Sequence, residues 1–269
     1  MTGLPVPSTP AGRAALAAVL AAPAAVLVAL DYDGTLAPIV DEPEQAVAHA
    51  GAADALAALA ARVGRVALVT GRPATDAVRL GRLSGVDGLV VLGHYGLERW
   101  SAGRLTTPEP HPGVATARAA AARLVAGAPA GVALEDKGHS VAVHTRQAAD
   151  PDAALVSLTV RVQELAERAG LEVAPGRYVL ELRPHGTDKG AAVRALVAET
   201  SARAVVYAGD DMGDLAAVAA LRELPVTALV VCSDSAESPQ ALRDAADLVV
   251  DGPAGVVRFL ADLARALPP

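Results

Sequence analysis

An apolar run that ends in two aspartates constrains this sequence more than any other feature. The run is Ala24-Ala25-Val26-Leu27-Val28-Ala29-Leu30, and Asp31-Tyr32-Asp33-Gly34-Thr35 follows it directly. A short, continuous stretch rich in Val and Leu is typical of a buried parallel strand. Open α/β sheets place their ligands at the carboxyl ends of such strands. Two carboxylates this close repel each other unless a positive group lies between them. Because Mg²⁺ prefers oxygen ligands, we expect a Mg²⁺ ion at this strand end.

Composition and charge narrow the class of protein. With 52% hydrophobic and 20% charged residues, the 269-residue chain is predicted to be globular. The net charge of −7 argues against a broad surface for nucleic acid or anionic membranes, although a local cationic cleft can still hold an anionic substrate. A single cysteine, Cys232, cannot form an internal disulfide, so a cytoplasmic location is expected. Pro23 interrupts the apolar stretch from 14 to 30, which favours a chain without a membrane span.

Predicted strands and helices alternate in the first and last parts of the chain, and the middle part has a different order of elements. The first part contains predicted elements at 12–22, 24–30, 50–62, 65–69 and 89–92. The middle part contains helices at 114–125 and 152–169 with strands at 132–136, 140–145, 171–174 and 178–182. The last part contains elements at 188–199, 204–208, 228–232, 239–245, 248–250 and a final helix to 266. The fold class predicted is α/β, a doubly wound, mainly parallel Rossmann-like core with an inserted α+β cap domain. The core is assigned to 1–104 and 184–269 and the cap to 105–183, and the proline-rich residues 1–10 are predicted to be a loose arm.

Polar residues follow several of the predicted strands. They are Asp31 and Asp33 after the first strand, Thr70 after the second, Lys189 at the start of a later helix, and Asp210, Asp211 and Asp214 after another strand. Each has an ordinary explanation, since an aspartate after a strand is often a helix N-cap. Together they supply a nucleophile, a hydroxyl, a cation and metal-binding carboxylates at one sheet edge. This set suits phosphoryl transfer, in which one carboxylate attacks phosphorus and a second moves protons.

The same motifs resemble those of the haloacid dehalogenase superfamily of phosphatases. Asp31-x-Asp33-Gly34-Thr35, Thr70, Lys189 and Gly209-Asp210-Asp211-x-x-Asp214 match its four motifs in order. The resemblance implies that Asp31 is the nucleophile and Asp33 the acid and base, with Thr70 and Lys189 as further catalytic residues. It implies metal contacts from Asp31, the Asp33 carbonyl and Asp210, with Asp214 as an outer partner and Asp211 as a further candidate. The phosphate-binding residues implied are Gly34, Thr70, Gly71, Arg72 and Lys189.

Within that superfamily, residues 24–260 are similar to the trehalose-6-phosphate phosphatases. The segments that carry this similarity are 30–40, Thr70-Gly71-Arg72-Pro73, Glu135-x-Lys137 through His144-x-Arg146, and 180–184 with Lys189-Gly190. The similarity implies Mg²⁺-dependent hydrolysis of trehalose 6-phosphate through an aspartyl-phosphate, as part of trehalose biosynthesis. It implies substrate contacts from the cap by Glu135, Lys137, His144, Arg146, Glu181 and Arg183. The sequence departs from the pattern at Tyr95, where a His followed by Gly is expected, and at Gly213 and Leu215.

Other interpretations stay open from the sequence. The six cap residues could form cross-strand salt bridges on a solvated face, which contribute little. The enzyme could act on another sugar phosphate, such as sucrose or glucosylglycerol phosphate, or be a phosphomutase, and the chain could be a non-catalytic sugar-phosphate sensor. The expected partner is a small-molecule sugar phosphate, with neither nucleic acid nor membrane, and the chain is expected to act as a monomer. The sequence assigns no role to His94, Tyr95 or His185.

Overall fold

The computed structural model describes residues 3–40 and 42–268, which form two compact units. The first unit contains the chain up to Thr107 and again from Asp188 onward, and the second unit is Pro108–Thr187. Along the sequence, the second unit is therefore inserted into the first. Each unit has hydrophobic core residues of its own.

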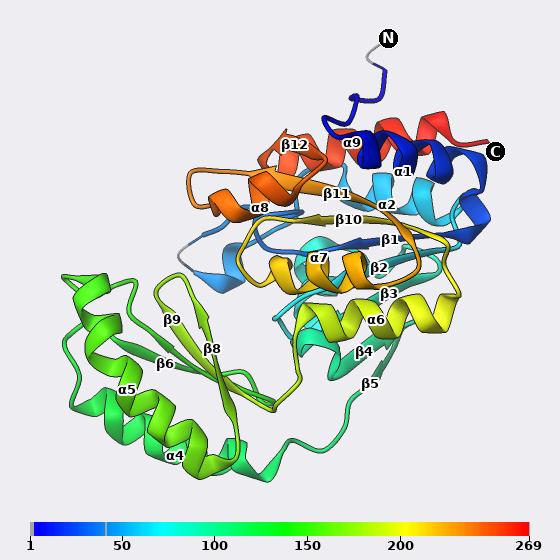
Figure 1. The fold of residues 1–269 in the computed structure, drawn as a ribbon. Coiled ribbons are helices and arrows are strands. Elements are labelled where there is room, and N and C mark those ends of the chain that lie inside the picture. The colour runs from blue at the N-terminus through cyan, green and yellow to red at the C-terminus, as the bar shows by residue number, and fades with distance from the viewer. Residues whose placement is uncertain (1–2, 41, 269) are drawn as a thin grey trace. The chain divides into compact units, whose positions relative to one another are not determined.

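The first unit is built on an eight-stranded sheet with the order β12-β11-β10-β1-β2-β3-β4-β5 (Figure 1). The strands from β12 to β3 are parallel, and β4 and β5 are added as an antiparallel hairpin. The predicted mainly parallel α/β sheet is thus confirmed. The strands are β1 (Val26–Leu30), β2 (Arg65–Val69), β3 (Leu89–Gly93), β4 (Glu98–Ser101), β5 (Arg104–Thr106), β10 (Ala204–Gly209), β11 (Thr227–Asp234) and β12 (Leu248–Asp251).

Helices cover both faces of this sheet, because the central strand buries both of its faces. Val28 and Leu30 of β1 belong to one core cluster, and Leu27 and Ala29 belong to the other. The first cluster includes α1 (Pro10–Ala21), α2 (Ala52–Ala60), α3 (Ala74–Gly81) and α9 (Gly252–Ala266), and the second includes α6 (Lys189–Thr200), α7 (Asp214–Glu223) and α8 (Gln240–Ala245). Figure 1 shows α1 and α9 on one side of the strands and α6 and α7 on the other.

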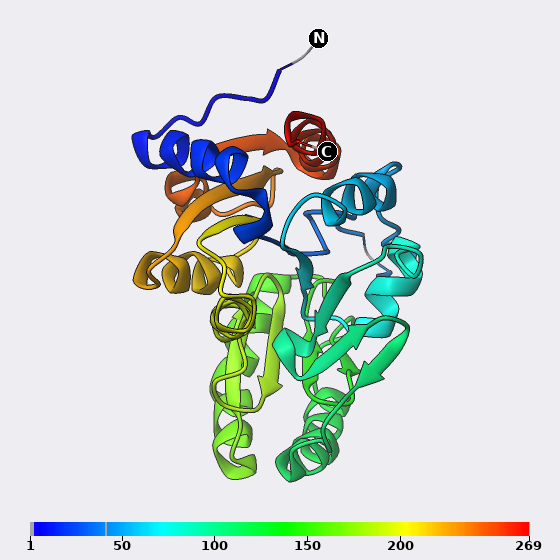
Figure 2. The ribbon, with the colours of Figure 1, turned by 90° about the vertical axis from the view of Figure 1, so that its right-hand side faces the viewer.

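The second unit is a four-stranded antiparallel sheet with two helices on one face. The sheet order is β6-β7-β9-β8, with bounds β6 (Ala133–Asp136), β7 (Val141–His144), β8 (Glu172–Gly176) and β9 (Val179–Arg183). Helices α4 (Pro112–Ala126) and α5 (Pro151–Ala169) pack against each other, as both views show (Figures 1 and 2). Val141, Val143, Leu180 and Leu182 point into the core shared with these helices. The predicted α+β unit with antiparallel pairing is therefore found.

The start of the described chain differs from the predicted loose arm. Helix α1 begins at Pro10 with Thr9 as its N-cap, since the Thr9 hydroxyl accepts a hydrogen bond from the Gly12 N–H. The Ser8 N–H donates to the Asp247 carbonyl oxygen at 2.8 Å, and the Thr9 hydroxyl donates to the Asp247 carboxylate. The prediction was wrong for this segment because the residue that holds it is more than 230 positions away in the sequence. Residues 1 and 2 lie outside the described chain.

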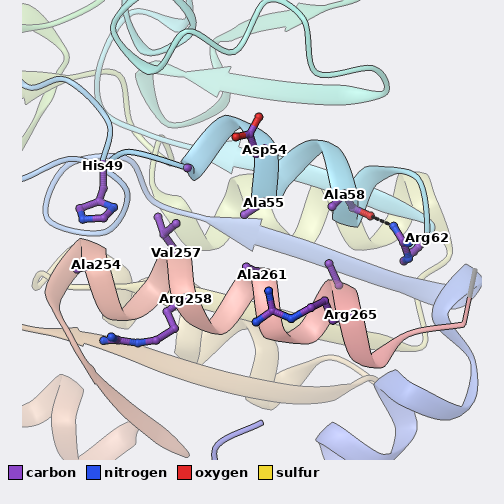
Figure 3. A pocket seen from close by; sticks show the side chains of 12 residues that line it. His49, Asp54, Ala55, Ala58, Arg62, Ala254, Val257, Arg258, Ala261 and Arg265 are labelled. Atoms are coloured by element: carbon purple, nitrogen blue, oxygen red, sulfur yellow. Dashed lines mark hydrogen bonds between the residues drawn. The ribbon is translucent and has the colours of Figure 1, made fainter. Parts of the chain in front are cut away.

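A groove of about 540 Å³ lies between α2 and α9 (Figure 3). Alanines from both helices, including Ala55, Ala58 and Ala261, line the groove, and arginines such as Arg62 and Arg265 lie along its sides. The groove contains none of the residues that the sequence assigned to chemistry. Within the described ranges, no helix combines the length and apolar character needed to cross a membrane.

Candidate active site

Three of the predicted site residues, Asp31, Thr70 and Asp210, follow three neighbouring strands of the large sheet. Strand β1 lies between β10 and β2, so the residues after these strands emerge at the same edge. The Asp31 N–H continues the ladder to the Ala208 carbonyl at 2.9 Å, and the Thr70 N–H donates to the Leu92 carbonyl at 3.0 Å. The parallel register therefore brings together Asp31, Thr70 and Asp210, which are far apart in the sequence.

Lys189 lies at the centre of a buried charge cluster. Its ammonium group is 2.7 Å from Asp31 Oδ2, 2.8 Å from Asp214 Oδ1 and 3.2 Å from Asp211 Oδ1. The Lys189 side chain is 3% exposed and those of Asp31 and Asp214 are also buried, so these two contacts are shielded from water, whereas the Asp211 side chain is 59% exposed. Burial alone would lower the pKa of Lys189, but the three aspartates raise it well above its ordinary value. The lysine is thus held as a cation beside the predicted nucleophile.

Asp214 is fully buried and is held by four donors. Its Oδ1 accepts from Lys189 and from the Tyr207 hydroxyl at 2.6 Å, and its Oδ2 accepts the Asp210 and Asp211 N–H groups at 2.9 Å each. Burial raises the pKa of Asp214 to about 6, partly offset by Lys189. Because both oxygens already have partners, Asp214 fixes the turn after β10 and the position of Lys189. Sequence reasoning missed Tyr207, which lies inside an apolar strand and resembles an ordinary core residue.

The carboxylates at this edge outnumber the nearby cations. Asp31, Asp211 and Asp214 share the Lys189 ammonium, and Asp210 adds a fourth carboxylate close by. Burial raises the pKa of Asp31 well above its ordinary value, and Asp214 and Asp211 add to the rise while Lys189 opposes it. Burial likewise raises the pKa of Asp210, with Asp31 next in importance. Such crowding favours a further positive group between the carboxylates.

The donor set fits a divalent cation. One carboxylate oxygen from each of Asp31, Asp210 and Asp214 lies within 4.8 Å of the others, and all three side chains are buried. Carboxylate oxygens are the ligands that hard divalent cations prefer. The Thr35 hydroxyl orients Asp210 through a 3.1 Å hydrogen bond to its Oδ1. Asp211 and Asp33, the other predicted metal contacts, are not in this group of side chains, and a contact through the Asp33 carbonyl stays a prediction.

Gly34 is required by the close approach of Asp210. Its φ is +69°, and a Cβ atom at this position would lie 1.9 Å from Asp210 Oδ2. A side chain would therefore both strain the backbone and displace the carboxylate. The Gly34 carbonyl accepts a hydrogen bond from the buried Ser233 hydroxyl at 2.6 Å, which ties the end of β11 to this loop. Sequence reasoning did not single out Ser233, because a serine at a strand end has no distinctive local pattern.

Arg72, predicted to bind phosphate, holds the carboxylate of Asp33. Its Nε and Nη2 donate to the two carboxylate oxygens at 2.6 Å each, and its Nη1 donates to the Pro43 carbonyl at 2.8 Å. Two parallel contacts fix both the position and the plane of a carboxylate. The Asp33 side chain is consequently turned toward Arg72, whereas the Asp31 side chain is turned toward Lys189. The two aspartates of the opening motif therefore have different environments.

Five of the six predicted sugar contacts lie on one face of the small sheet in the second unit or just beyond its strands, and Arg146 lies in the turn after β7. Glu135 pairs with Ala142 and Ala142 with Glu181, so these positions form a row across β6, β7 and β9. The side chains that alternate with this row enter the core against α4 and α5. The polar row is therefore on the face opposite these helices, together with His144 and Arg183, and Lys137 reaches it from just after β6.

The charged groups on this face contact one another. His144 Nε2 lies 2.8 Å from Glu135 Oε2, and Lys137 Nζ lies 3.6 Å from Glu181 Oε2. The Arg183 guanidinium is 3.0 Å from Glu172, and the Arg146 guanidinium lies 5.8 Å from the centre of the Tyr178 ring. Ser140 donates to Glu181 Oε1 at 2.5 Å. Sequence reasoning missed Ser140 and Glu172, although their strand positions would have placed them on this face.

Comparison with known proteins agrees with the motifs. The family model described as trehalose-phosphatase matches residues 29–248. A trehalose-phosphate phosphatase of Mycobacterium marinum is 34% identical over 256 residues, which cover 89% of this chain and 62% of that protein. An uncharacterized glycosyl hydrolase, Rv2006 of Mycobacterium tuberculosis, is 38% identical over 255 residues, which cover 88% of this chain and 18% of that protein. The chain thus spans less than two thirds of the length of these relatives.

Solved structures share the fold. A trehalose-6-phosphate phosphatase related protein has a TM-score of 0.70 and 26% identity, over 89% of this chain and 97% of the other. The C-terminal domain of a Candida albicans trehalose-6-phosphate phosphatase has a TM-score of 0.76 and 19% identity, over 99% of this chain and all of the other. At that identity, the second likeness is evidence for the fold alone.

Proposed function

The chain belongs to the trehalose-phosphatase family, and we propose that it hydrolyses trehalose 6-phosphate to trehalose and phosphate with Mg²⁺ as cofactor. One observation carries the proposal: the buried Asp31 carboxylate is paired with Lys189 at the sheet edge that also holds Asp210 and Thr70. A non-catalytic sensor has no need for this complete set of reactive groups. The arrangement therefore supports an enzyme.

In the proposed reaction, Asp31 is the nucleophile. A carboxylate oxygen forms a bond to phosphorus while the bond between phosphorus and the sugar oxygen breaks, and the sugar oxygen keeps that electron pair. Water then attacks the aspartyl-phosphate, which frees the carboxylate and releases inorganic phosphate. Lys189 and the Thr70 hydroxyl supply positive charge and a hydrogen bond to the phosphoryl oxygens, where charge accumulates in both steps.

Asp33 carries the protons in this scheme. It protonates the departing sugar oxygen in the first step and accepts a proton from water in the second. Arg72 orients its carboxylate through the two 2.6 Å hydrogen bonds. Asp31 is thus held by Lys189 as the nucleophile, and Asp33 is held by Arg72 as the group that moves protons.

The chemistry of the donor set supports Mg²⁺. Asp31 and Asp210 would hold it directly with the Asp33 carbonyl, while Asp214, whose oxygens already have four donors, would brace the site. When bound, the ion supplies positive charge that reduces repulsion between the carboxylates and the phosphoryl group. Gly34 leaves the space that Asp210 needs to reach this position.

We assign recognition of the sugar to the polar face of the small sheet. Glu135, Lys137, His144, Arg146, Glu181 and Arg183 place carboxylate acceptors beside cationic donors there. A sugar offers many hydroxyls that donate and accept hydrogen bonds, and such a mixed surface can satisfy both roles. Isolated cross-strand ion pairs would add about 1 kcal/mol or less each, so stability alone gives little reason to gather so many charged groups here.

The first test is phosphate release from trehalose 6-phosphate, sucrose 6-phosphate, glucosylglycerol phosphate and glucose 6-phosphate. We expect kcat/KM for trehalose 6-phosphate to exceed that for each of the others at least about tenfold, because buried polar groups reject a ligand that leaves them without partners. EDTA should reduce turnover about 10²-fold or more, with recovery on adding Mg²⁺. Equal rates across the panel would refute the disaccharide assignment, and full activity in EDTA would refute the metal.

Glu181→Ala tests the sugar face separately from the chemistry. We expect kcat/KM for trehalose 6-phosphate to fall about 10²-fold, the cost of losing a buried hydrogen-bonding carboxylate, with a change of less than about threefold for para-nitrophenyl phosphate. The control is Glu164→Ala on α5 of the same unit, where the carboxylate is exposed and 3.8 Å from Arg168. A loss of equal size on both substrates would argue against sugar recognition by Glu181.

A further inference from the structure

The residues His94-Tyr95-Gly96, directly after β3, adopt a left-handed turn beside the Thr70 loop. His94 and Tyr95 have φ values of +46° and +58°, in a backbone region that residues other than glycine rarely occupy. Two adjacent residues in this conformation store strain that the surrounding contacts must offset. Such backbone strain is commonly found at active sites and ligand-binding sites.

Backbone hydrogen bonds join this turn to the loop that follows β2. The Tyr95 N–H donates to the Thr70 carbonyl at 2.9 Å, and the His94 N–H donates to the Arg72 carbonyl at 3.0 Å. The fit is close at both ends, because a Cβ on Gly93 would lie 2.3 Å from the Ala74 nitrogen and one on Gly71 would lie 2.6 Å from the Tyr95 hydroxyl. The turn thus holds the backbone of residues 70–74 in place through hydrogen bonds and close packing.

The Glu98 side chain adds a further contact between the His94 turn and the start of α3. Its Oε2 accepts the Ala74 N–H at 2.7 Å, and its Oε1 lies 3.8 Å from His94 Nε2. Ala74 is the first residue of α3, and the N-cap residue of that helix, Pro73, has no side-chain hydrogen bond to it. Glu98, from β4, therefore supplies from a distance the acceptor that a local N-cap would give, and its negative charge suits a helix N-terminus.

We infer that Glu98 is a positioning residue for phosphoryl transfer, an inference that rests on the proposed function of this edge. By holding Ala74, Glu98 fixes the strand-to-helix turn that presents the Thr70 hydroxyl to the phosphoryl group and Arg72 to Asp33. Glu98 itself touches neither substrate nor metal ligands in this scheme. Its loss should misplace Thr70 and Arg72 while the carboxylates on β1 and β10 stay in place.

The test compares Glu98→Ala and Glu98→Gln with Asp247→Ala. Asp247 is a suitable control, since its carboxylate is also buried (8% exposed against 9%) and also accepts one backbone N–H, from Val230 at 2.9 Å, with the Thr9 hydroxyl as a second contact where Glu98 has His94. Both alanine variants should lower the melting temperature by similar amounts. Glu98→Ala alone should lower kcat about 10- to 100-fold on both trehalose 6-phosphate and para-nitrophenyl phosphate, because both present the same phosphoryl group. Glu98→Gln keeps an oxygen for the Ala74 N–H and should restore kcat to within about threefold of the wild type.

Binding of inorganic phosphate and of Mg²⁺ to the Glu98 variants can be measured without turnover. Calorimetry should find weaker binding of inorganic phosphate by Glu98→Ala, by about tenfold, with unchanged affinity for Mg²⁺. Wild-type kcat and phosphate affinity in Glu98→Ala, or an equal kcat loss in Asp247→Ala, would overturn the inference. Failure of the proposed function would be seen differently, as a wild-type protein that releases phosphate from the aryl substrate without preferring trehalose 6-phosphate.

Discussion

Replacing Asp31 with asparagine should lower kcat by about 10⁴-fold or more, the scale expected when a nucleophile is removed. An amide oxygen is a poor nucleophile, whereas the Asp31 carboxylate is buried and paired with Lys189 at 2.7 Å. The fold should survive, because the single amide oxygen of asparagine can still accept from the Tyr32 N–H, which donates to Asp31 Oδ1 at 2.7 Å, while Lys189 keeps its contacts with Asp211 and Asp214. The variant should therefore separate chemistry from folding.

Stability gives this variant a second readout. Asp31 is one of three carboxylates that contact the Lys189 ammonium, and burial followed by repulsion from Asp214 raises its pKa. Removing its charge relieves that repulsion, so we expect an unchanged or higher melting temperature in EDTA. The control is Asp54→Asn, the same chemical change at an exposed position on α2, which should alter neither kcat nor melting temperature. Retention of more than a tenth of wild-type kcat by Asp31→Asn would show that another group attacks phosphorus.

The sequence predicted the sheet edge well because its signals are local. Apolar runs followed directly by Asp31, Thr70 and Asp210 mark strand ends, and parallel pairing then places these residues together. Period-two alternation similarly placed Glu135 and Glu181 on faces that the antiparallel register aligns in one row. Both inferences need only the regular geometry of strands and no knowledge of side-chain packing.

The residues that support the site could not be found in this way. Tyr207, Ser233 and Glu98 act through single hydrogen bonds to partners on other elements, at 2.6, 2.6 and 2.7 Å. Their own neighbours in the sequence give no pattern for such contacts, since the partner is chosen by three-dimensional packing. The pairing of Arg72 with Asp33 was missed for the same reason. Local periodicity predicts which edge holds the chemistry, and tertiary packing decides how each group is oriented.

Replacing Lys189 with methionine should cause the largest loss of stability of any change at this edge. The substitution keeps length and burial but leaves Asp31, Asp211 and Asp214 without their shared cation. We expect the free energy of unfolding in EDTA to fall by about 3–5 kcal/mol, the usual cost of leaving a buried partner charge uncompensated. We also expect kcat to fall about 10²- to 10³-fold through lost stabilisation of the phosphoryl oxygens. Urea unfolding and steady-state kinetics measure the two effects.

A matched control on the same helix is Arg194→Met, which breaks an exposed pair at 2.7 Å to Glu223 and should cost about 1 kcal/mol or less. Adding Mg²⁺ should recover part of the stability of Lys189→Met, because a cation bound by the same carboxylates offsets their repulsion. The double variant Lys189→Met with Asp31→Asn should be more stable than the sum of the single effects predicts. Strict additivity would mean that Lys189 does not stabilise the fold through Asp31, and the buried pair would then be retained for catalysis alone.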